Sequence, residues 1–358
     1  MPINQLYDTW IRRIRELRPS QRITQVRNFV WLMIGIYQSR SVSLSRIAGK
    51  MPGRAKLLSN TRRLSRLLDN PAIRVREWYE PIAGQWLETQ FRNLGEIHLI
   101  VDGTKIGFGH QLLMVCLAYR KRAIPLAWTW VKHVKGRSRT SQHLALLAYV
   151  RSLIPPGAAV FLVGDSEFGS VAALRQLDKW RWFYVLRQNA DTCVWLNEQS
   201  DWRTFQSHIH QPGQSLWLGT GYLALKQIYP LNLLVHWKVG EKEPWYLATN
   251  LPDLRMALRF YARRMWIEEM FADLKKHGFD LERTMLRHFL RLSRLTLAVA
   301  ILYVWLISVA TQTIRAGLRH WVDRTDRRDL SIFQIGLRFL ERCLINQLPF
   351  RTSLCSYR

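Results

Sequence analysis

The pattern of apolar and polar positions changes character at about residue 90. Before that point apolar residues recur at helical spacing, most clearly in segments 22–37 and 57–68. Pro52 and Gly53 separate two short helical stretches, and the second carries basic residues on one side, namely Arg62, Arg63 and Arg66. Two short helices about a turn fit a DNA-binding helix-turn-helix and fit equally a helical bundle with a solvated basic face. Residues 1–90 are predicted to be a helical DNA-binding region.

From about residue 91 short apolar runs alternate with helical segments. The runs predict strands at 98–102, 111–119, 123–131, 159–165 and 182–187. The periodic segments between them predict helices at 141–153 and 169–180. This order predicts an α/β fold in which helices pack on a mixed sheet.

Residues 191–246 form a further section with a pattern of its own. Short alternating runs are interleaved with tryptophans and punctuated by glycines, which predicts an antiparallel β insertion. The insertion divides the predicted catalytic core into residues 91–190 and 247–315. The remainder, 316–358, is predicted to be a basic helical C-terminal tail.

One segment, 295–310, is apolar enough to be mistaken for a membrane span. It is short for a bilayer, which needs ~20 residues, and the N-terminal residues lack the apolar run of a signal peptide. We expect a core helix and no membrane association. A membrane-anchored basic protein is the competing hypothesis, and solubility without detergent would separate the two.

Composition narrows the class of partner. Lysine and arginine total 53 against 26 acidic residues, so the net charge is +27, and the excess runs along the whole chain. Such a surface favours a polyanion, of which nucleic acid is the commonest large one. The four cysteines are far apart in the sequence, which indicates neither a zinc site nor a disulfide framework.

A single helix is predicted from about Leu254 to Lys276, and it carries the candidate chemistry. At 100° per residue, Tyr261, Arg264, Glu268 and Lys275 fall within an arc of about 60°, beside an apolar stripe. Two cations and a hydroxyl donor suit a phosphate, whereas a carboxylate repels one unless a metal ion lies between them. The plain alternative is a solvated face with ion pairs along the helix.

Two aspartates follow buried runs elsewhere in the chain. Asp102 and Asp165 each come at the end of a predicted strand, where a charge is costly unless paired or metal-bound. Either one alone could simply cap the next turn, as Asp102-Gly103 suggests. Both together with Glu268 favour a metal site.

The helix carries a family likeness. Tyr261, Arg264, Glu268 and Lys275 match the Y-x2-R-x3-E-x6-K signature of the IS4-family DDE transposases, which the chain therefore resembles over roughly residues 20–315. The two strand-end aspartates and the β insertion before the glutamate also fit the family arrangement. The resemblance implies a bacterial insertion-sequence transposase with an RNase H-like core, active in the cytoplasm at the nucleoid.

The resemblance also assigns roles to residues. Asp102, Asp165 and Glu268 would be catalytic and hold two Mg²⁺ ions, for which Mn²⁺ can substitute. Tyr261, Arg264 and Lys275 would bind DNA phosphates. Glu269 lies about 100° from Glu268 around the helix, so Glu268 is the expected ligand. Glu167 follows Asp165 by two residues and could reach the site, and we expect it either to support the metal ligands from behind or to belong to a solvated turn.

The family route implies cleavage of double-stranded DNA at terminal inverted repeats through a hairpin, followed by strand transfer into target DNA. A hairpin needs a base moved out of the stack onto an aromatic platform. Trp217, Trp237 and Trp266 are candidates, and each could instead belong to the core.

Two further expectations concern assembly and activity. A homodimer is expected in the DNA complex, and the apolar face of segment 332–344 could serve it. The alternative function is a domesticated or inactive transposase that only binds DNA, against which the intact acidic triad argues.

Overall fold

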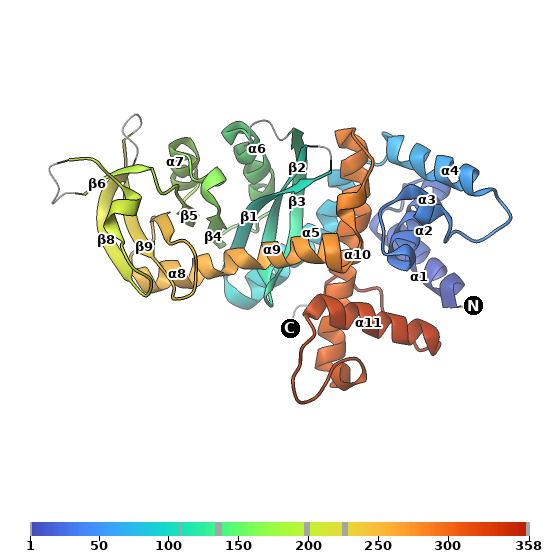
Figure 1. Ribbon diagram of the computed structural model, residues 1–358. Coiled ribbons are helices and arrows are strands. Elements are labelled where there is room, and N and C mark those ends of the chain that lie inside the picture. Colours follow the sequence, from blue (N-terminus) through green and yellow to red (C-terminus); the bar gives the residue numbers. More distant parts are fainter. Residues whose placement is uncertain (1, 108, 133–137, 197–200, 224–227, 356–358) are drawn as a thin grey trace.

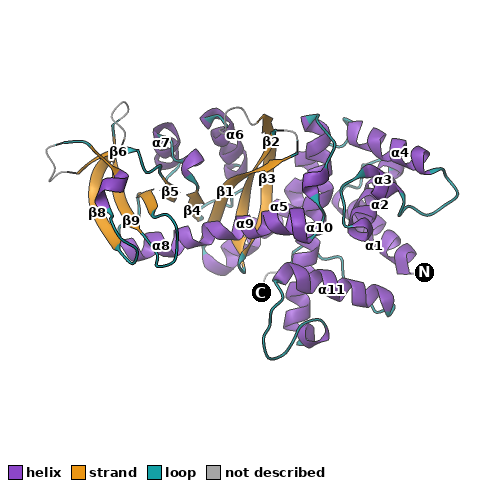
Figure 2. Ribbon diagram, in the orientation of Figure 1, coloured by secondary structure: helices purple, strands orange, loops and turns teal. Residues whose placement is uncertain are grey.

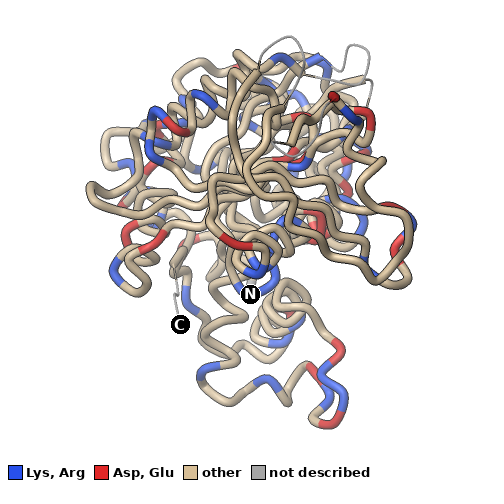
Figure 3. Tube along the Cα trace, turned by 90° about the vertical axis from the view of Figure 1, so that its left-hand side faces the viewer, with Lys and Arg blue, Asp and Glu red and all other residues tan. Residues whose placement is uncertain are grey.

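The computed structural model describes residues 2–107, 109–132, 138–196, 201–223 and 228–355 (Figure 1). The chain begins with helices, as the apolar periodicity predicts: α1 (Pro2–Leu17), α2 (Ile23–Ser39), α3 (Leu44–Ala48), α4 (Leu57–Asp69) and α5 (Val75–Leu94). Helices cluster at this end, and strands occupy the centre and the opposite end (Figure 2). Lysine and arginine are spread along the whole trace (Figure 3). A charge distributed in this way suits contact with an extended polyanion.

The N-terminal helices favour the bundle over the helix-turn-helix. Helix α3 has only five residues, and residues 49–56 separate it from α4, a longer connection than the three or four residues of a helix-turn-helix turn. Helix α4 buries Leu64, Leu67 and Leu68 and contacts α2 and α10 (Phe289–Arg315). Its arginines remain on the exposed side.

The sheet has ten strands in the described chain, in the order β3-β2-β1-β4-β5-β10-β9-β8-β6-β7. Strands β1 to β3 form an antiparallel meander, and β1 pairs with β4, and β4 with β5, in parallel. The bounds of the first five are β1 (Glu96–Ile106), β2 (His110–Tyr119), β3 (Arg122–Lys132), β4 (Ala159–Gly164) and β5 (Phe183–Arg187). Helix α6 (Thr140–Arg151) precedes β4, and α7 (Val171–Lys179) follows it. This is an RNase H-like mixed α/β sheet flanked by helices, as the resemblance implies.

The predicted β insertion extends this sheet. Its strands are β6 (Cys193–Leu196), β7 (Arg203–Thr204), β8 (Ser215–Leu223), β9 (Tyr229–His236) and β10 (Trp245–Thr249). All their pairings are antiparallel, and β10 pairs with β5 of the core. The insertion is therefore continuous with the core sheet through backbone hydrogen bonds.

One predicted strand boundary differs from the structure. Asp102 is not at a strand end, because β1 continues to Ile106 in a hairpin with β2. The apolar run from His98 shows only the part of the strand that is buried on both faces. Most of the basic segment 133–139, which follows β3, lies outside the described residues.

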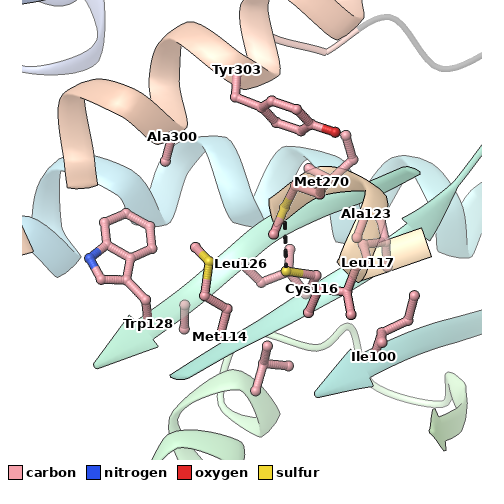
Figure 4. Close-up of a cluster of buried hydrophobic side chains, with 14 of the residues drawn as sticks. Ile100, Met114, Cys116, Leu117, Ala123, Leu126, Trp128, Met270, Ala300 and Tyr303 are labelled. Carbon is pink, nitrogen blue, oxygen red and sulfur yellow. Dashed lines mark hydrogen bonds between the residues drawn. The ribbon is translucent and has the colours of Figure 1, made fainter. Parts of the chain in front are cut away.

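Helix α10 is the centre of the core. By length and composition it could cross a membrane, but 94% of its most apolar stretch is buried in this structure. Figure 4 shows Ala300 and Tyr303 of α10 above Met270, with Cys116 and Trp128 of the sheet on the other side. The Cys116 thiol contacts the Met270 sulfur at 3.9 Å. Segment 295–310 is thus the core helix that its length predicts.

The C-terminal helix α11 (Ile332–Ile345) corrects the suggested dimer face. Its apolar residues, Ile332, Phe333, Ile335, Leu337 and Leu340, are buried and the helix packs on α10. Phe333 stacks on Tyr303 with ring centroids 5.5 Å apart. This face is used within the chain and is not available to a second copy.

The contact between α10 and α11 depends on a glycine. A methyl group at Gly336 would collide with the backbone carbonyl of Leu306. Gly336→Ala should lower the free energy of unfolding by about 1–3 kcal/mol, because backbone cannot yield as a side chain can. Gly84→Ala in α5, where a methyl group meets nothing within 4 Å, is the matched control and should gain about 0.5–1 kcal/mol. Denaturant melts of both variants measure this, and equal stabilities would contradict the close packing.

Candidate active site

The predicted helix at 254–276 is a helical segment whose hydrogen bonding changes along its length. It consists of α8 (Leu254–Tyr261), a 3₁₀ turn (Ala262–Arg264), α9 (Met265–Ala272) and a π turn (Asp273–His277). The Asp253 side chain caps the start by accepting from the backbone N–H of Met256 at 2.9 Å. The segment contacts strands β1 to β5 and crosses the sheet (Figure 1). The catalytic candidates of the helix are thereby held against the strands.

The parallel pairing of β1 with β4 brings the two aspartates together. The last paired residues are Val101 and Gly164, and Asp102 and Asp165 are the next residue of each strand segment. Neighbouring strands lie about 4.8 Å apart, so two residues at matching positions are neighbours. Strand pairing alone therefore makes these two residues adjacent, although they are far apart in the chain.

Glu268 completes the group from above the sheet. Asp102, Asp165 and Glu268 line one cavity of about 460 Å³, together with Arg264, Lys275, Lys276 and Glu282, the backbone near Gly103 and Thr104, and Phe271 and Ala272. Four acids thus share one cavity with three cations, and the three acids predicted to be catalytic come from separate parts of the sequence. The acids predicted to act together are brought together.

Arg264 lies between two of the acids. Its Nη1 donates to Asp102 Oδ2 at 2.9 Å and its Nη2 to Glu268 Oε1 at 2.5 Å. The Arg264 and Asp102 side chains are each 11% exposed, and that of Glu268 is 43% exposed. Breaking a buried pair of this kind leaves an uncompensated charge, so the contact matters to stability as well as to chemistry.

The negative charge of the cavity is only partly compensated. The pKa of Asp102 is raised to about 7, chiefly by burial and also by the Asp165 and Glu268 carboxylates, against the opposing effect of Arg264. Oδ1 of Asp165 is buried and has no hydrogen-bond donor in the described chain. A buried carboxylate oxygen without a partner is costly, and a cation would satisfy it.

A divalent metal ion suits this set of donors. Hard ions such as Mg²⁺ and Mn²⁺ take carboxylate oxygens, and the unpartnered Asp165 oxygen is such a donor. Among the residues described, no three acidic, histidine or cysteine side chains are already arranged around one point as metal ligands. The Arg264 guanidinium between Asp102 and Glu268 explains this, and it would have to move for those two to share an ion.

The other predicted phosphate ligands differ in exposure. The Lys275 ammonium lines the cavity, pairs with Glu282 at 2.9 Å and donates to the Lys105 carbonyl at 2.9 Å. Tyr261 is only 1% exposed, and its hydroxyl is buried without a partner in the described chain. Burial raises the pKa of Tyr261. The Lys275 side chain therefore lines the cavity, whereas the Tyr261 hydroxyl is buried.

The neighbouring glutamates point to different partners. Glu269 pairs with Arg122 at 3.3 Å, and Arg122 also binds the buried Asp273 at 2.7 Å. Glu268 rather than Glu269 faces the cavity, as the helical geometry predicts. Arg122, at the start of β3, had no distinguishing signal in the sequence.

Glu167 does not line the cavity. Its carboxylate accepts hydrogen bonds from Ser138 and Gln111, residues that the sequence pattern did not single out. Their roles depend on three-dimensional contacts between segments far apart in the chain.

None of the three candidate tryptophans lines the acidic cavity. Trp217 is half-buried on β8, and Trp237 donates to the Glu241 carbonyl at 2.9 Å. Trp266 lines a separate cavity of about 380 Å³ with His98 and Arg263. Their base-stacking role stays a prediction.

Comparison with known proteins identifies the family. No curated protein matches the sequence. Among solved structures, the chain is similar to piggyBac transposase in a synaptic complex with hairpin DNA, determined by cryo-EM, at 11% identity and a TM-score of 0.46 over 97% of this chain and 83% of that one. The family model of the transposase DDE domain matches residues 93–305, more than half of the chain, and includes Asp102, Asp165 and Glu268. The chain belongs to the DDE transposase family, whose members are metal-dependent enzymes of DNA cleavage and strand transfer.

Proposed function

We propose that this chain is the transposase of a bacterial insertion sequence of the IS4 family, acting at the nucleoid in the cytoplasm. It cleaves DNA with Mg²⁺ at the terminal inverted repeats of its element, through a hairpin, and transfers the ends into target DNA. The observation that carries the proposal is the meeting of Asp102, Asp165 and Glu268 in one cavity. A domesticated chain that only binds DNA would have no need to keep these three acids together.

The three carboxylates are the proposed metal ligands. Two bound Mg²⁺ ions would lower the pKa of the attacking water or 3′-hydroxyl and stabilise the leaving oxygen of an in-line displacement. Asp102 and Asp165, fixed by strand pairing, supply oxygens from the sheet, and Glu268 supplies them from α9. Mn²⁺ takes the same oxygen donors and should substitute.

Cations beside the acids are the proposed phosphate contacts. Lys275 and Arg264 would hold the non-reacting phosphate oxygens, and positioning of this kind is a large share of catalysis in phosphoryl transfer. Both cations are paired with acids in the free protein, so DNA and metal would exchange these partners. Tyr261 would contribute only after a local rearrangement that exposes its hydroxyl.

The N-terminal region 1–90 offers a second DNA contact. A cavity of about 510 Å³ between α2 and α4 is lined by Arg22, Arg62, Arg63 and Arg66, with neutral polar residues and Leu67 making up the rest (Thr24, Gln25, Asn28, Ser59 and Asn70). No acid belongs to this described lining. Four arginines around neutral hydrogen-bonding side chains favour phosphate groups of double-stranded DNA.

Two further elements of the proposal concern the assembled complex. The half-buried Trp217 and Trp237 of the insertion, and Trp266 of α9, are candidates to stack an extruded base during hairpin formation. A homodimer would hold the two transposon ends, and its interface would use a surface other than the buried face of α11.

The adjacent glutamates provide a matched test of the catalytic assignment. Glu268→Ala should reduce Mg²⁺-dependent cleavage of DNA carrying the terminal repeats by more than about 100-fold, since even residues behind metal ligands cost 10–100-fold. Glu269→Ala removes the same group one residue away, where it meets Arg122, and should cut at a rate near that of the wild type. Gel assays of cleavage and DNA binding measure both. Normal cleavage by Glu268→Ala would refute the site.

The arginine-lined cavity between α2 and α4 can be tested through the salt dependence of binding. Replacing Arg62 and Arg66 with alanine should weaken DNA binding across all sequences. It should also reduce the slope of log affinity against log salt by about one for each phosphate that the protein no longer neutralises. Arg255→Ala, on the exposed surface of α8, is the control for the change in net charge. An unchanged slope in the double variant would remove this cavity from the DNA interface.

The position of Arg264 between two acids predicts a stability effect. In buffer free of divalent ions, Arg264→Gln should lower the free energy of unfolding by about 3 kcal/mol, because Asp102 loses its cation. Added Mg²⁺ should raise the melting temperature of this variant more than that of the wild type. Arg255→Gln should show neither change. If Arg264→Gln leaves the melting temperature unchanged, the Arg264–Asp102 ion pair does not contribute to stability.

A further inference from the structure

Glu167 lies at the centre of a buried polar cluster outside the acidic cavity. Its Oε1 accepts from the backbone N–H of Ser138 at 2.6 Å and from the Ser138 hydroxyl at 2.5 Å. Its Oε2 accepts from Gln111 Nε2 at 2.8 Å. The buried His143 ring contacts the same hydroxyl, at 2.5 Å. The carboxylate thus joins the turn after β4 to the start of β2 and to the segment that leads into α6.

The cluster reaches the catalytic aspartates from behind. Gln111 pairs with Lys105 across β1 and β2, so its side chain lies on the same sheet face as Gly103 and on the face opposite Asp102. A side chain at Gly103 would collide with the Gln111 amide. Gln111 therefore packs directly beneath the backbone that bears Asp102, while Glu167 is two residues from Asp165.

A second contact fixes the other end of the same turn. Gln188 Nε2 donates to the Gly169 carbonyl at 3.2 Å, and a methyl group at Gly169 would collide with this amide. The turn of residues 165–169 is thus tied to β5 by Gln188 and to β2 by Gln111. Asp165 Oδ1 is itself buried and has no hydrogen-bond partner in the described chain.

We propose that Glu167 is a positioning residue, which through Gln111 and Ser138 holds Asp165 at its distance from Asp102. The inference rests on the proposed function of the acidic cavity. Both oxygens of Glu167 are already engaged by donors, and the residue does not line the cavity, so it acts through Asp165 and does not bind the metal itself. Its effect is on how well the cavity holds a divalent ion.

An isosteric variant separates positioning from ligation. In Glu167→Gln the amide oxygen can still accept from Ser138, and the amide N–H can donate to Gln111 Oε1 once the Gln111 amide turns over. That Gln111 oxygen is buried and has no partner in the described chain, so rotating the amide breaks no existing hydrogen bond to this oxygen. Glu167→Ala instead leaves the Ser138 backbone N–H and Gln111 Nε2 without their acceptor, and each buried donor left in this way is costly.

The experiment compares Glu167→Gln, Glu167→Ala and Gln111→Leu with the wild type and with Glu268→Ala. The readouts are the Mg²⁺ concentration that gives half of the full rise in melting temperature, and the Mg²⁺ dependence of cleavage. Glu167→Gln should stay within about threefold of the wild type in both, whereas Glu167→Ala should need about 10- to 100-fold more Mg²⁺. Gln111→Leu, a buried apolar replacement, should also need more Mg²⁺ than the wild type. This variant provides the test if Glu167→Ala does not fold.

The outcomes are distinct. If folded Glu167→Gln loses Mg²⁺ binding to the same extent as Glu268→Ala, Glu167 is itself a ligand and the proposal is overturned. An unchanged Mg²⁺ requirement in both Glu167→Ala and Gln111→Leu would overturn it as well. A wild-type protein that neither binds Mg²⁺ nor cuts DNA would instead refute the proposed function of the cavity.

Discussion

The parallel pairing of β1 with β4 is the constraint on which the site depends. It places Asp102 and Asp165 side by side independently of their side-chain contacts, because their backbone positions follow from the hydrogen bonds between the strands. Burial is the main reason that the pKa of Asp102 is raised, and the neighbouring Asp165 carboxylate raises it further. The sheet has to be stable enough to impose the arrangement, and the largely buried α10 behind it supplies that stability.

Compensation of this charge comes from the helical segment that crosses the sheet. Arg264 bridges Asp102 and Glu268, and Lys275 pairs with Glu282 at the rim of the cavity. In the free protein these cations offset part of the negative charge of the acids. Under the proposed function the same cations would hold a phosphodiester, so one set of residues would serve both the stability of the free state and the binding of substrate.

Much of the fold and of the site was predictable from the sequence. Periodicity located most strands and helices within a few residues, and the spacing from Tyr261 to Lys275 identified the helix that carries Glu268. The extent of β1 was missed, because its second half is half-buried and polar residues there resemble a turn. The Glu167 cluster was also missed as a unit. Gln111, Ser138 and His143 are ordinary residues whose role arises only when three separate segments meet.

The adjacent residues Glu268 and Glu269 show that contacts on one face of a helix affect a residue on the other face. Glu268 can be loosely held and 43% exposed because the neighbouring turn fixes the helix from the other side, where Arg122 binds Glu269 and the buried Asp273. Asp273 begins the π turn, so the tether lies between the helix that bears Glu268 and the turn that bears Lys275. If Glu268 exchanges Arg264 for a metal ion, its carboxylate has to be free to move while the helix that bears it stays fixed as a rigid base. The buried Arg122–Asp273 pair supplies that base, and the Glu269 carboxylate, which is 56% exposed, adds little to it.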